Sequence, residues 1–400
     1  MPADSLEGTV LDGRYLVEAR IATGGMSTVY RGNDTRLDRP VALKVMDSRY
    51  AGDNQFLSRF QLEARAVARL KDPGLVAVYD QGLDSQHPFL VMELVDGGTL
   101  RELLRERGPM PPHAATAVLR PVLGGLAVAH RAGLVHRDVK PENVLISDDG
   151  EVKLADFGLV RAVAEAGITS TSVILGTAAY LSPEQVSSGN AGPRSDVYSV
   201  GILAYELLTG VTPFTGDNAL TVAYQRMDND VAAPSTVIDG VPPQFDELVL
   251  RATARDPADR YADALEMKAD LDAVAAELNL PAFRVPAPRH SAQHTSAARY
   301  HSRGDGNRTT EAEPVRNATR QFTRDDMPGF TPPGVQGLSA DGNYPAAERF
   351  AGIEIAEFAY ARARGRRMML FWTTVVLILT AGVAAAAWTI GSNLSVLLSS

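Results

Sequence analysis

The sequence predicts an α+β fold in which a small β-rich lobe precedes a larger helical lobe, followed by a disordered linker and one transmembrane helix. Three observations predict this order. Short alternating runs separated by Gly and Asp clusters continue to residue 92, helical patterns dominate 98–274, and an apolar run without a charge occupies 368–390. We therefore expect regions of different architecture within the 400-residue chain.

Composition narrows the classes of function. The hydrophobic content of 45% supports a sizeable core. The net charge of −9 argues against nucleic acid as a partner, because no long basic stripe balances it. The chain has no cysteine, which excludes a disulfide framework and a thiolate metal site. Residues 1–14 form a polar N-terminal lead without the apolar core of a signal peptide.

The β-rich lobe is expected at 15–92. Apolar residues that alternate along short runs are typical of half-buried strands. A helix is expected at 54–70, where Phe56, Phe60 and Ala64 recur at helical spacing. The strands are predicted at 15–21, 27–32, 40–46, 75–80 and 89–92.

After a connecting segment at 93–97 the pattern becomes helical. The segment 196–209 is apolar nearly all round, which is typical of a helix inside a domain. Further helices are predicted at 99–107, 113–132, 243–254 and 262–278.

One loop places a carboxylate, an ammonium group and an amide close together, in Asp138, Lys140 and Asn143. A second predicted strand then delivers Asp156 in an Asp-Phe-Gly sequence. Phosphoryl transfer requires a group that orients a hydroxyl, a cation on the moving phosphate and oxygen ligands for Mg²⁺. A short charged loop is otherwise ordinary surface, but this combination of residue types favours chemistry. The two loops resemble the catalytic loop and the Mg²⁺ loop of eukaryotic-type (Hanks-type) protein kinases.

The resemblance covers about 15–274 and implies the bilobal protein kinase fold, with an N-lobe at 15–92, a hinge at 93–97 and a C-lobe at 98–274. It also implies roles for single residues. Asp138 would orient the substrate hydroxyl and Lys140 would neutralise the γ-phosphate. The remaining residues of this group are Asn143 and Asp156, which would hold Mg²⁺ (or Mn²⁺), and Thr177, which would bridge Asp138 and Lys140.

By the same resemblance, Lys44 would contact the α- and β-phosphates of ATP, and Glu63 on the following helix would form an ion pair with it. An ordinary solvated carboxylate is the alternative for Glu63. The glycine-rich flap is only partly matched, because Ala22 and Ser27 replace two of its glycines. The expected ATP-binding residues are Ile21, Ala22, Thr23, Gly24, Gly25, Met26, Ser27, Val29, Ala42, Lys44, Met92, Glu93, Val95 and Leu145.

The resemblance further identifies 159–181 as an activation segment. Its Ser- and Thr-rich patch is either an ordinary solvated loop or a site of autophosphorylation at Thr169 and Thr171. Arg137 would bind a phosphate arriving from this segment. Three structural residues are also implied: Asp196, which would bind the backbone of the catalytic loop, and Glu184 with Arg260, which would form an ion pair.

The C-terminal part predicts a membrane anchor. Residues 286–349 have the composition of a disordered juxtamembrane linker, and 350–367 form a basic segment expected to contact lipid. The run 368–390 is long enough to span a bilayer as a single helix. Arginines precede it and no charge follows it, so the kinase domain is expected in the cytoplasm and the tail 391–400 outside the cell membrane. A buried core helix is the alternative.

These features together resemble bacterial transmembrane Ser/Thr kinases of the actinobacterial Pkn group. The resemblance implies transfer of the ATP γ-phosphate to protein Ser or Thr hydroxyls. Two alternatives remain open: a pseudokinase scaffold, and a small-molecule phosphotransferase of related fold, which the Ser-Pro-Glu sequence at 182–184 disfavours. Candidate further partners are a second copy of the chain, through Gly382 and Ala386, and a phosphothreonine-reading protein on the linker.

Overall fold

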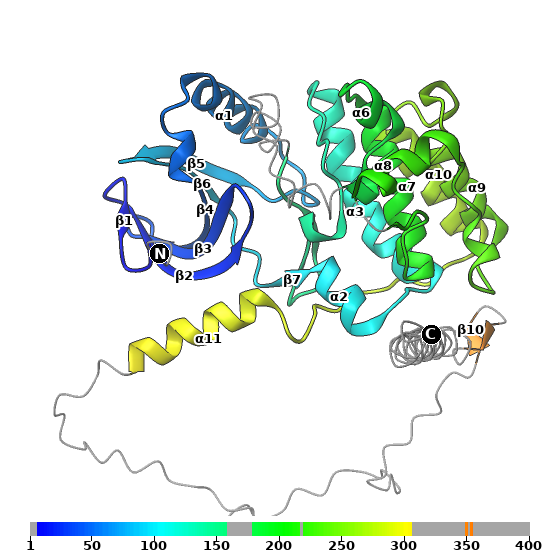
Figure 1. Cartoon of the computed structure of the whole chain (residues 1–400). Coiled ribbons are helices and arrows are strands. Elements are labelled where there is room, and N and C mark those ends of the chain that lie inside the picture. The colour runs from blue at the N-terminus through cyan, green and yellow to red at the C-terminus, as the bar shows by residue number, and fades with distance from the viewer. Residues whose placement is uncertain (1–5, 158–177, 217–218, 306–348, 351–352, 355–400) are drawn as a thin grey trace, which may run out of the picture.

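The computed structural model describes residues 6–157, 178–216, 219–305, 349–350 and 353–354. Within these ranges the protein has a β-rich N-lobe and a helical C-lobe that lie side by side (Figure 1). No helix in the described ranges is both long and apolar enough to cross a membrane, and the predicted span 368–390 lies outside them. Two short strands near the C-terminus, β10 (Arg349–Phe350) and β11 (Ile353–Glu354), pair in antiparallel fashion.

The N-lobe is built on a six-stranded antiparallel sheet in the order β1-β2-β3-β4-β6-β5. Helix α1 (Asn54–Val67) packs its buried aromatic side chains, Phe56 and Phe60, in one cluster with residues of the sheet. The helix begins after Asp53, whose carboxylate accepts hydrogen bonds from two backbone amides of the first turn. The strands are β1 (Val10–Leu11), β2 (Tyr15–Thr23), β3 (Ser27–Asp34), β4 (Arg39–Met46), β5 (Val78–Asp84) and β6 (His87–Met92).

The strand predicted at 75–80 forms further along the chain, at Val78–Asp84. Residues before it pair with the C-lobe instead. The amide of Val76 donates to the carbonyl of Leu154 at 3.0 Å, and the amide of Leu154 donates to the carbonyl of Gly74 at 2.8 Å. These backbone hydrogen bonds join the two lobes next to the candidate site. The alternation of apolar residues in the sequence does not reveal them.

The C-lobe surrounds helix α7 (Pro193–Thr209), which is buried along nearly its whole length and ends at Gly210 in the left-handed conformation. A three-stranded sheet at the lobe boundary has the order β7-β8-β9. Its strands are β7 (Gly97–Thr99), β8 (Val144–Ser147) and β9 (Val152–Leu154). The other helices of the lobe are α2 (Leu100–Arg107), α3 (Pro112–Arg131), α6 (Pro183–Ser187), α8 (Ala219–Asp228), α9 (Pro243–Ala252) and α10 (Ala264–Glu277).

One prediction is wrong at its boundary: the linker predicted from residue 286 does not begin there. Residues Ala292–Asp305 form helix α11, which contacts β2 of the N-lobe and β7 at the hinge (Figure 1). The buried side chains of this helix include Gln293 and Ser296, which are polar. The helix therefore lacks the apolar stripe by which a packed helix is usually recognised.

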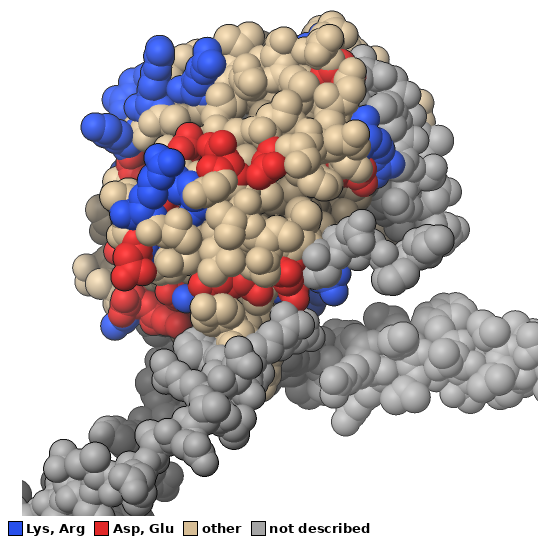
Figure 2. Space-filling view, turned by 90° about the vertical axis from the view of Figure 1, so that its left-hand side faces the viewer, with Lys and Arg blue, Asp and Glu red and all other residues tan. Residues whose placement is uncertain are grey.

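Basic and acidic side chains are interspersed on the N-lobe face of the molecule. Figure 2 shows Asp and Glu side chains lying between groups of Lys and Arg on this face, without a continuous surface of one sign. This pattern accompanies a formal net charge of −9 for the whole chain.

Candidate active site

The loop that carries Asp138 is fixed to helix α7 by a fully buried carboxylate. Asp196 Oδ2 accepts a hydrogen bond from the amide of His136 at 2.7 Å, and Oδ1 accepts one from the amide of Arg137 at 2.7 Å. His130 Nε2 also lies 2.9 Å from Oδ2. The predicted contact between Asp196 and the loop backbone therefore forms, and it mounts the loop on the most buried helix of the C-lobe.

Three polar side chains that the sequence singled out form one hydrogen-bonded group. Lys140 Nζ donates to both carboxylate oxygens of Asp138, at 3.0 and 2.8 Å. Asn143 Nδ2 donates to the backbone oxygen of Asp138 at 2.7 Å and to its Oδ2 at 3.0 Å. The Asp138 carboxylate is thus held in one orientation, with only a small part of it exposed.

The second loop is joined to the first by His136, a residue that sequence reasoning gave no role. Its Nε2 lies 2.9 Å from the carbonyl oxygen of Ala155, and its ring lies 4.6 Å from the ring of Phe157. Arg137 and Asp156 both adopt positive φ angles, of 69° and 64°. Such a conformation is uncommon outside glycine and is frequently found where a loop aims a functional side chain.

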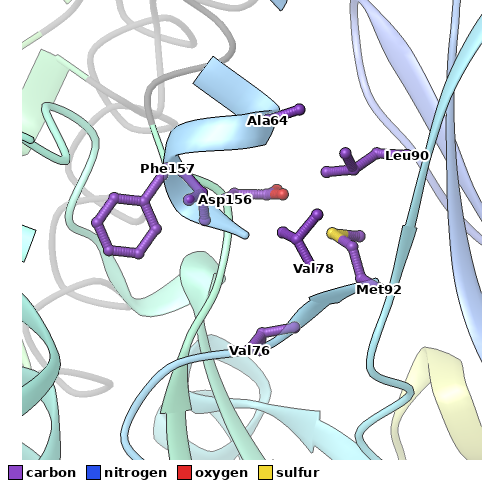
Figure 3. A pocket seen from close by; sticks show the side chains of 8 residues that line it. Ala64, Val76, Val78, Leu90, Met92, Asp156 and Phe157 are labelled. Atoms are coloured by element: carbon purple, nitrogen blue, oxygen red, sulfur yellow. The ribbon is translucent and has the colours of Figure 1, made fainter. Parts of the chain in front are cut away.

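Asp156 pairs with Lys44 across the lobe boundary, with 2.8 Å between Oδ1 and Nζ. Figure 3 shows the Asp156 carboxylate and the ring of Phe157 pointing in opposite directions from their loop, below helix α1. The carboxylate faces a small cavity lined by Ala64 of α1, by Leu90 and Met92 of β6, and by neighbouring residues. Phe157 thus lies beneath α1, the helix that carries Glu63.

The predicted ion pair of Lys44 needs correction. In the described residues Lys44 forms an ion pair with Asp156, and no ion pair between Lys44 and Glu63 is present there. Glu63 is half-buried on α1 and has interactions of its own. The carboxylate that contacts Lys44 therefore comes from the Asp-Phe-Gly loop and not from α1.

The charge of Asp156 is favoured by its surroundings. Burial raises the pKa of the Asp156 carboxyl, but the charge and hydrogen bond of Lys44, with the nearby charges of His136 and Lys140, lower it below its usual value. The group is therefore a carboxylate at neutral pH. A carboxylate held near two lysines provides the electrostatics that a bound triphosphate and its cation require.

An apolar cluster that includes several of the expected ATP-binding residues lies beside these charges. Ala42 of β4 and Met92 of β6 are register neighbours and are buried in the same cluster, and Val95 and Leu145 pack against it. In the hinge, the amide of Glu93 donates to Ala77 O at 2.8 Å. The backbone amide of Val95 and the backbone carbonyl of Glu93 have no hydrogen-bond partner among the described residues. They are therefore available to form hydrogen bonds with the polar edge of a bound ligand.

The flap over this cluster is a tight β2–β3 turn. The amide of Gly24 donates to Ser27 O at 2.8 Å, and Ala22 is paired with Val29 across the two strands. Ala22, Thr23, Gly24 and Gly25 are exposed, whereas Ile21, Met26 and Ser27 are half-buried. Ala22 and Ser27, which replace two glycines of the flap, are therefore residues of strands β2 and β3, with a register irregularity between Arg20 and Ala22.

The donor set fits a hard divalent cation that takes most of its ligands from a substrate. Because Asn143 uses its amide nitrogen on Asp138, its Oδ1 remains as an acceptor, and Asp156 supplies a carboxylate. No group of three or more His, Cys, Asp or Glu side chains that could hold a metal occurs in the part of the chain described here. One carboxylate and one amide with substrate phosphates is a typical arrangement for Mg²⁺.

The predicted ion pair between Glu184 and Arg260 forms with bidentate geometry, at 2.9 and 3.0 Å. The Arg260 side chain is fully buried and also donates to three backbone carbonyls. Burial raises the pKa of Glu184, but hydrogen bonds from Arg260 and Ser195 bring it below its usual value. This pair fastens α6, the helix that follows residue 182, to the C-lobe.

A second buried network was missed from the sequence. Arg101 of α2 binds Glu206 Oε1 at 2.5 Å, Glu142 Oε1 at 2.7 Å and the hydroxyl of Tyr180 at 2.6 Å. The Tyr180 hydroxyl also donates to Glu206. No sequence pattern links these residues, since Arg101 and Glu206 lie 105 positions apart.

Three predicted site residues lie outside the described ranges. Thr169 and Thr171, predicted as autophosphorylation sites, and Thr177, predicted to bridge Asp138 and Lys140, fall within 158–177. Their roles stay predictions.

Comparison with known proteins identifies the family. The model of the protein kinase domain family matches residues 15–270. The chain is 72% identical over 395 residues to the serine/threonine-protein kinase PknL of Mycobacterium tuberculosis, covering 99% of this chain and 98% of the relative. It is 45% identical over 267 residues to PknB of the same species, covering 65% of this chain and 43% of the relative.

Solved structures agree with this assignment. The kinase domain of M. tuberculosis PknI is 28% identical, with a TM-score of 0.54, and the match covers 68% of this chain and all of that domain. The similarity to PknL also agrees with the Pkn group that the sequence features suggested. The chain therefore belongs to the protein kinase family, as a eukaryotic-type serine/threonine protein kinase of the actinobacterial Pkn group.

Proposed function

We propose that this kinase is a membrane-anchored signalling enzyme that transfers the γ-phosphate of ATP to Ser or Thr hydroxyls of proteins and is activated by autophosphorylation. The observation that carries the catalytic part is the group of Asp138, Lys140 and Asn143 next to the Lys44–Asp156 pair. The family in general uses ATP and a divalent metal ion, and the described donor set fits both.

The geometry suggests how the chain's own residues act. The Asp138 carboxylate, held by Lys140 and Asn143, is oriented to accept a hydrogen bond from the substrate hydroxyl and to take its proton during transfer. Lys140 then lies close to the moving phosphate, and Lys44 can contact the phosphates behind it. A divalent cation held by Asn143 and Asp156 would supply charge neutralisation on those phosphates.

Activation by autophosphorylation is supported by the environment of Arg137. Its Nε is buried and has no hydrogen-bond partner among the described residues. A buried guanidinium nitrogen without a partner carries a free-energy penalty, and a phosphate is its strongest complement. We infer that phosphate on Thr169 or Thr171 binds Arg137 and thereby orders the activation segment.

Replacement of both Thr169 and Thr171 by Ala should lower the rate of substrate phosphorylation by about tenfold or more, because the ordering phosphate is lost. Replacement of Thr309 and Thr310 in the linker is the matched control and should leave that rate unchanged. The measurement is incorporation of labelled phosphate into a generic protein substrate. An unchanged rate in the first variant, with the phosphate confirmed absent, contradicts the activation step.

Membrane anchoring rests on the sequence of the C-terminal part. The run 368–390 is apolar and follows Arg362, Arg364, Arg366 and Arg367, which are suited to anionic lipid on the cytoplasmic side. The similarity to PknL extends over 99% of the chain, so it includes this part. A second copy contacting Gly382 and Ala386, and a phosphothreonine-reading partner on the linker, are the protein partners that we propose.

The anchoring is tested by fractionation of cells that express the intact chain or a variant lacking 368–390. We expect the intact chain to resist alkaline extraction from membranes, and an added protease outside the cell to remove only a tag on the tail 391–400. If alkaline extraction releases the intact chain as completely as the deletion variant, the chain is not anchored. That result would leave the proposed kinase activity standing, because activity is measured separately in both proteins.

A further inference from the structure

Residues 284–305, which we term the strap, run from the C-lobe across the outer side of the hinge to the N-lobe. The strap includes α11 and follows the last helix of the kinase domain, α10. Figure 1 shows α11 lying along the edge of the N-lobe next to β2 and leading from β7 and α2. The two lobes are therefore connected outside the hinge by a second, packed segment.

The first half of the strap is anchored to the C-lobe by apolar burial and hydrogen bonds. Val285 is buried in the main C-lobe core, and Arg284 donates to the backbone carbonyl of Asp149 at 2.7 Å. Two strap amides donate to carboxylates of α2: Arg289 N to Glu106 at 2.8 Å and Ala292 N to Glu102 at 2.9 Å. Because these bonds use backbone groups, they position the strap accurately.

The middle of the strap is packed directly on the hinge. A Cβ built at Gly98, just after the hinge, would lie 2.4 Å from Pro288 Cγ and 2.7 Å from Ser291 Cβ. Only glycine at this position permits such a close approach. Gln293 Nε2 donates to Asp96 Oδ1 of the hinge at 3.4 Å, and the same carboxylate oxygen accepts from Arg31 of β3 at 3.1 Å.

The last part of the strap lies against the N-lobe. Helix α11 contacts β2, and Ser296 on it is only 1% exposed. The charge of Glu18 on β2, together with a hydrogen bond between the two side chains, raises the pKa of Tyr300. Arg31 lies 3.5 Å from Glu18 and 3.1 Å from Asp96, so one polar network joins β2, β3, the hinge and the strap.

We propose that the strap is a positioning segment that holds the two lobes in the arrangement required for nucleotide binding. Lys44 belongs to the N-lobe and Asp156 to the C-lobe, and they meet at 2.8 Å while the strap is docked on both lobes. Besides the strap, the lobes are joined by the short hinge at 93–97 and by the backbone hydrogen bonds of Gly74 and Val76 to Leu154. A segment bound on both sides restricts their relative motion, so that less conformational freedom is lost when ATP binds between them.

The test measures kinetics of the intact chain carrying Ser296→Arg, which places a long charged side chain under α11. Ala298→Arg is the matched control, because Ala298 lies on the exposed side of the same helix. Ser296→Ala keeps the close approach and should behave as the parent. We expect KM for ATP to rise about fivefold or more in Ser296→Arg alone, while kcat changes by less than about twofold.

A second variant replaces residues 284–305 by a Gly-Ser stretch of equal length, with 310–331 replaced in the same way as its control. The chain has no native cysteine, so spin labels at Leu37→Cys and Leu250→Cys, both exposed, report the distance between lobes. We expect that distance distribution to broaden only when the strap is replaced or when Ser296→Arg is present.

The proposal is overturned if KM for ATP and the interlobe distances stay at parent values in Ser296→Arg. It is also overturned if kcat and thermal stability fall while KM for ATP does not change, since the strap would then only stabilise the fold. If Ser296→Arg does not fold, the milder Gln293→Ala, which removes the hydrogen bond to Asp96, replaces it. A raised KM for ATP in Gln293→Ala then supports the proposal, and an unchanged KM overturns it.

Discussion

Replacement of Asp196 by Asn tests how the catalytic loop is positioned. The Asp196 carboxylate is fully buried and accepts two backbone amides, at 2.7 Å each, as well as the ring of His130. His130 accepts a hydrogen bond from the amide of Ala264 at its Nδ1, so its Nε2 is the donor toward Asp196. All three groups that face the carboxylate are therefore donors.

An Asn side chain has only one oxygen, so its NH₂ group must face at least one of these donors. The variant loses one charge-assisted hydrogen bond, worth about 1.5–3 kcal/mol, and leaves one amide without an acceptor, which costs about 1–3 kcal/mol. The free energy of unfolding should fall by about 3–5 kcal/mol, a large part of the total of about 5–15 kcal/mol for a domain. The amide that loses its partner precedes Asp138, so kcat should fall by about 10².

The assay combines thermal unfolding, followed by circular dichroism, with steady-state phosphorylation of a protein substrate. Asp246→Asn is the control, because Asp246 also accepts a backbone amide, that of Ser235 at 2.9 Å, far from the active site. The control should lose about 1 kcal/mol and no activity. If Asp196→Asn retains kcat and loses no more stability than the control, the reasoning on loop positioning is refuted.

Further predictions concern the buried ion pairs. Arg260→Leu leaves Glu184 partly buried without its partner and should lower the unfolding free energy by about 3 kcal/mol in thermal melts. A loss smaller than that of an exposed ion pair would contradict a stabilising role for the Glu184–Arg260 pair. Since the folded-state pKa of Glu184 is below its unfolded value of 4.5, its stabilisation is complete above that pH and is lost as pH falls through the folded pKa. Glu184→Gln should therefore reduce the fall of the melting temperature as pH drops below 4.5, and an unchanged slope would exclude this source. Arg101→Ala leaves the buried Glu206 carboxylate without its cation and should lower stability by about 3 kcal/mol. Arg120→Ala, which breaks an exposed ion pair, is the control in the same melts.

The parts of the site that sequence could predict are local in the chain. Asp138, Lys140 and Asn143 lie within one loop, so residue types and spacing alone indicate that they act together. Helix α7 was predictable because its residues are apolar on all sides. The contact from Asp196 and the pair of Glu184 with Arg260 were implied by resemblance to the kinase family, and the structure forms both.

The parts that sequence did not predict depend on how distant elements approach one another. Whether Lys44 meets Glu63 or Asp156 depends on the position of α1 and on the backbone angle at Asp156, neither of which appears in the local pattern. The sequence does not indicate helix α11, because its buried positions carry Ser and Gln rather than apolar residues. The Arg101 network joins residues from four separate segments, so only a folded chain brings it together.

The central claim is that Asp138 directs the acceptor hydroxyl while separate residues bind the nucleotide. The most direct measurement is single-turnover phosphate transfer by Asp138→Asn, combined with equilibrium binding of ATP and Mg²⁺ to the same protein. We expect the transfer rate to fall by about 10²–10⁴ with nucleotide affinity within about twofold of the parent. Transfer at the parent rate, or loss of nucleotide binding together with transfer, would contradict the assignment of Asp138.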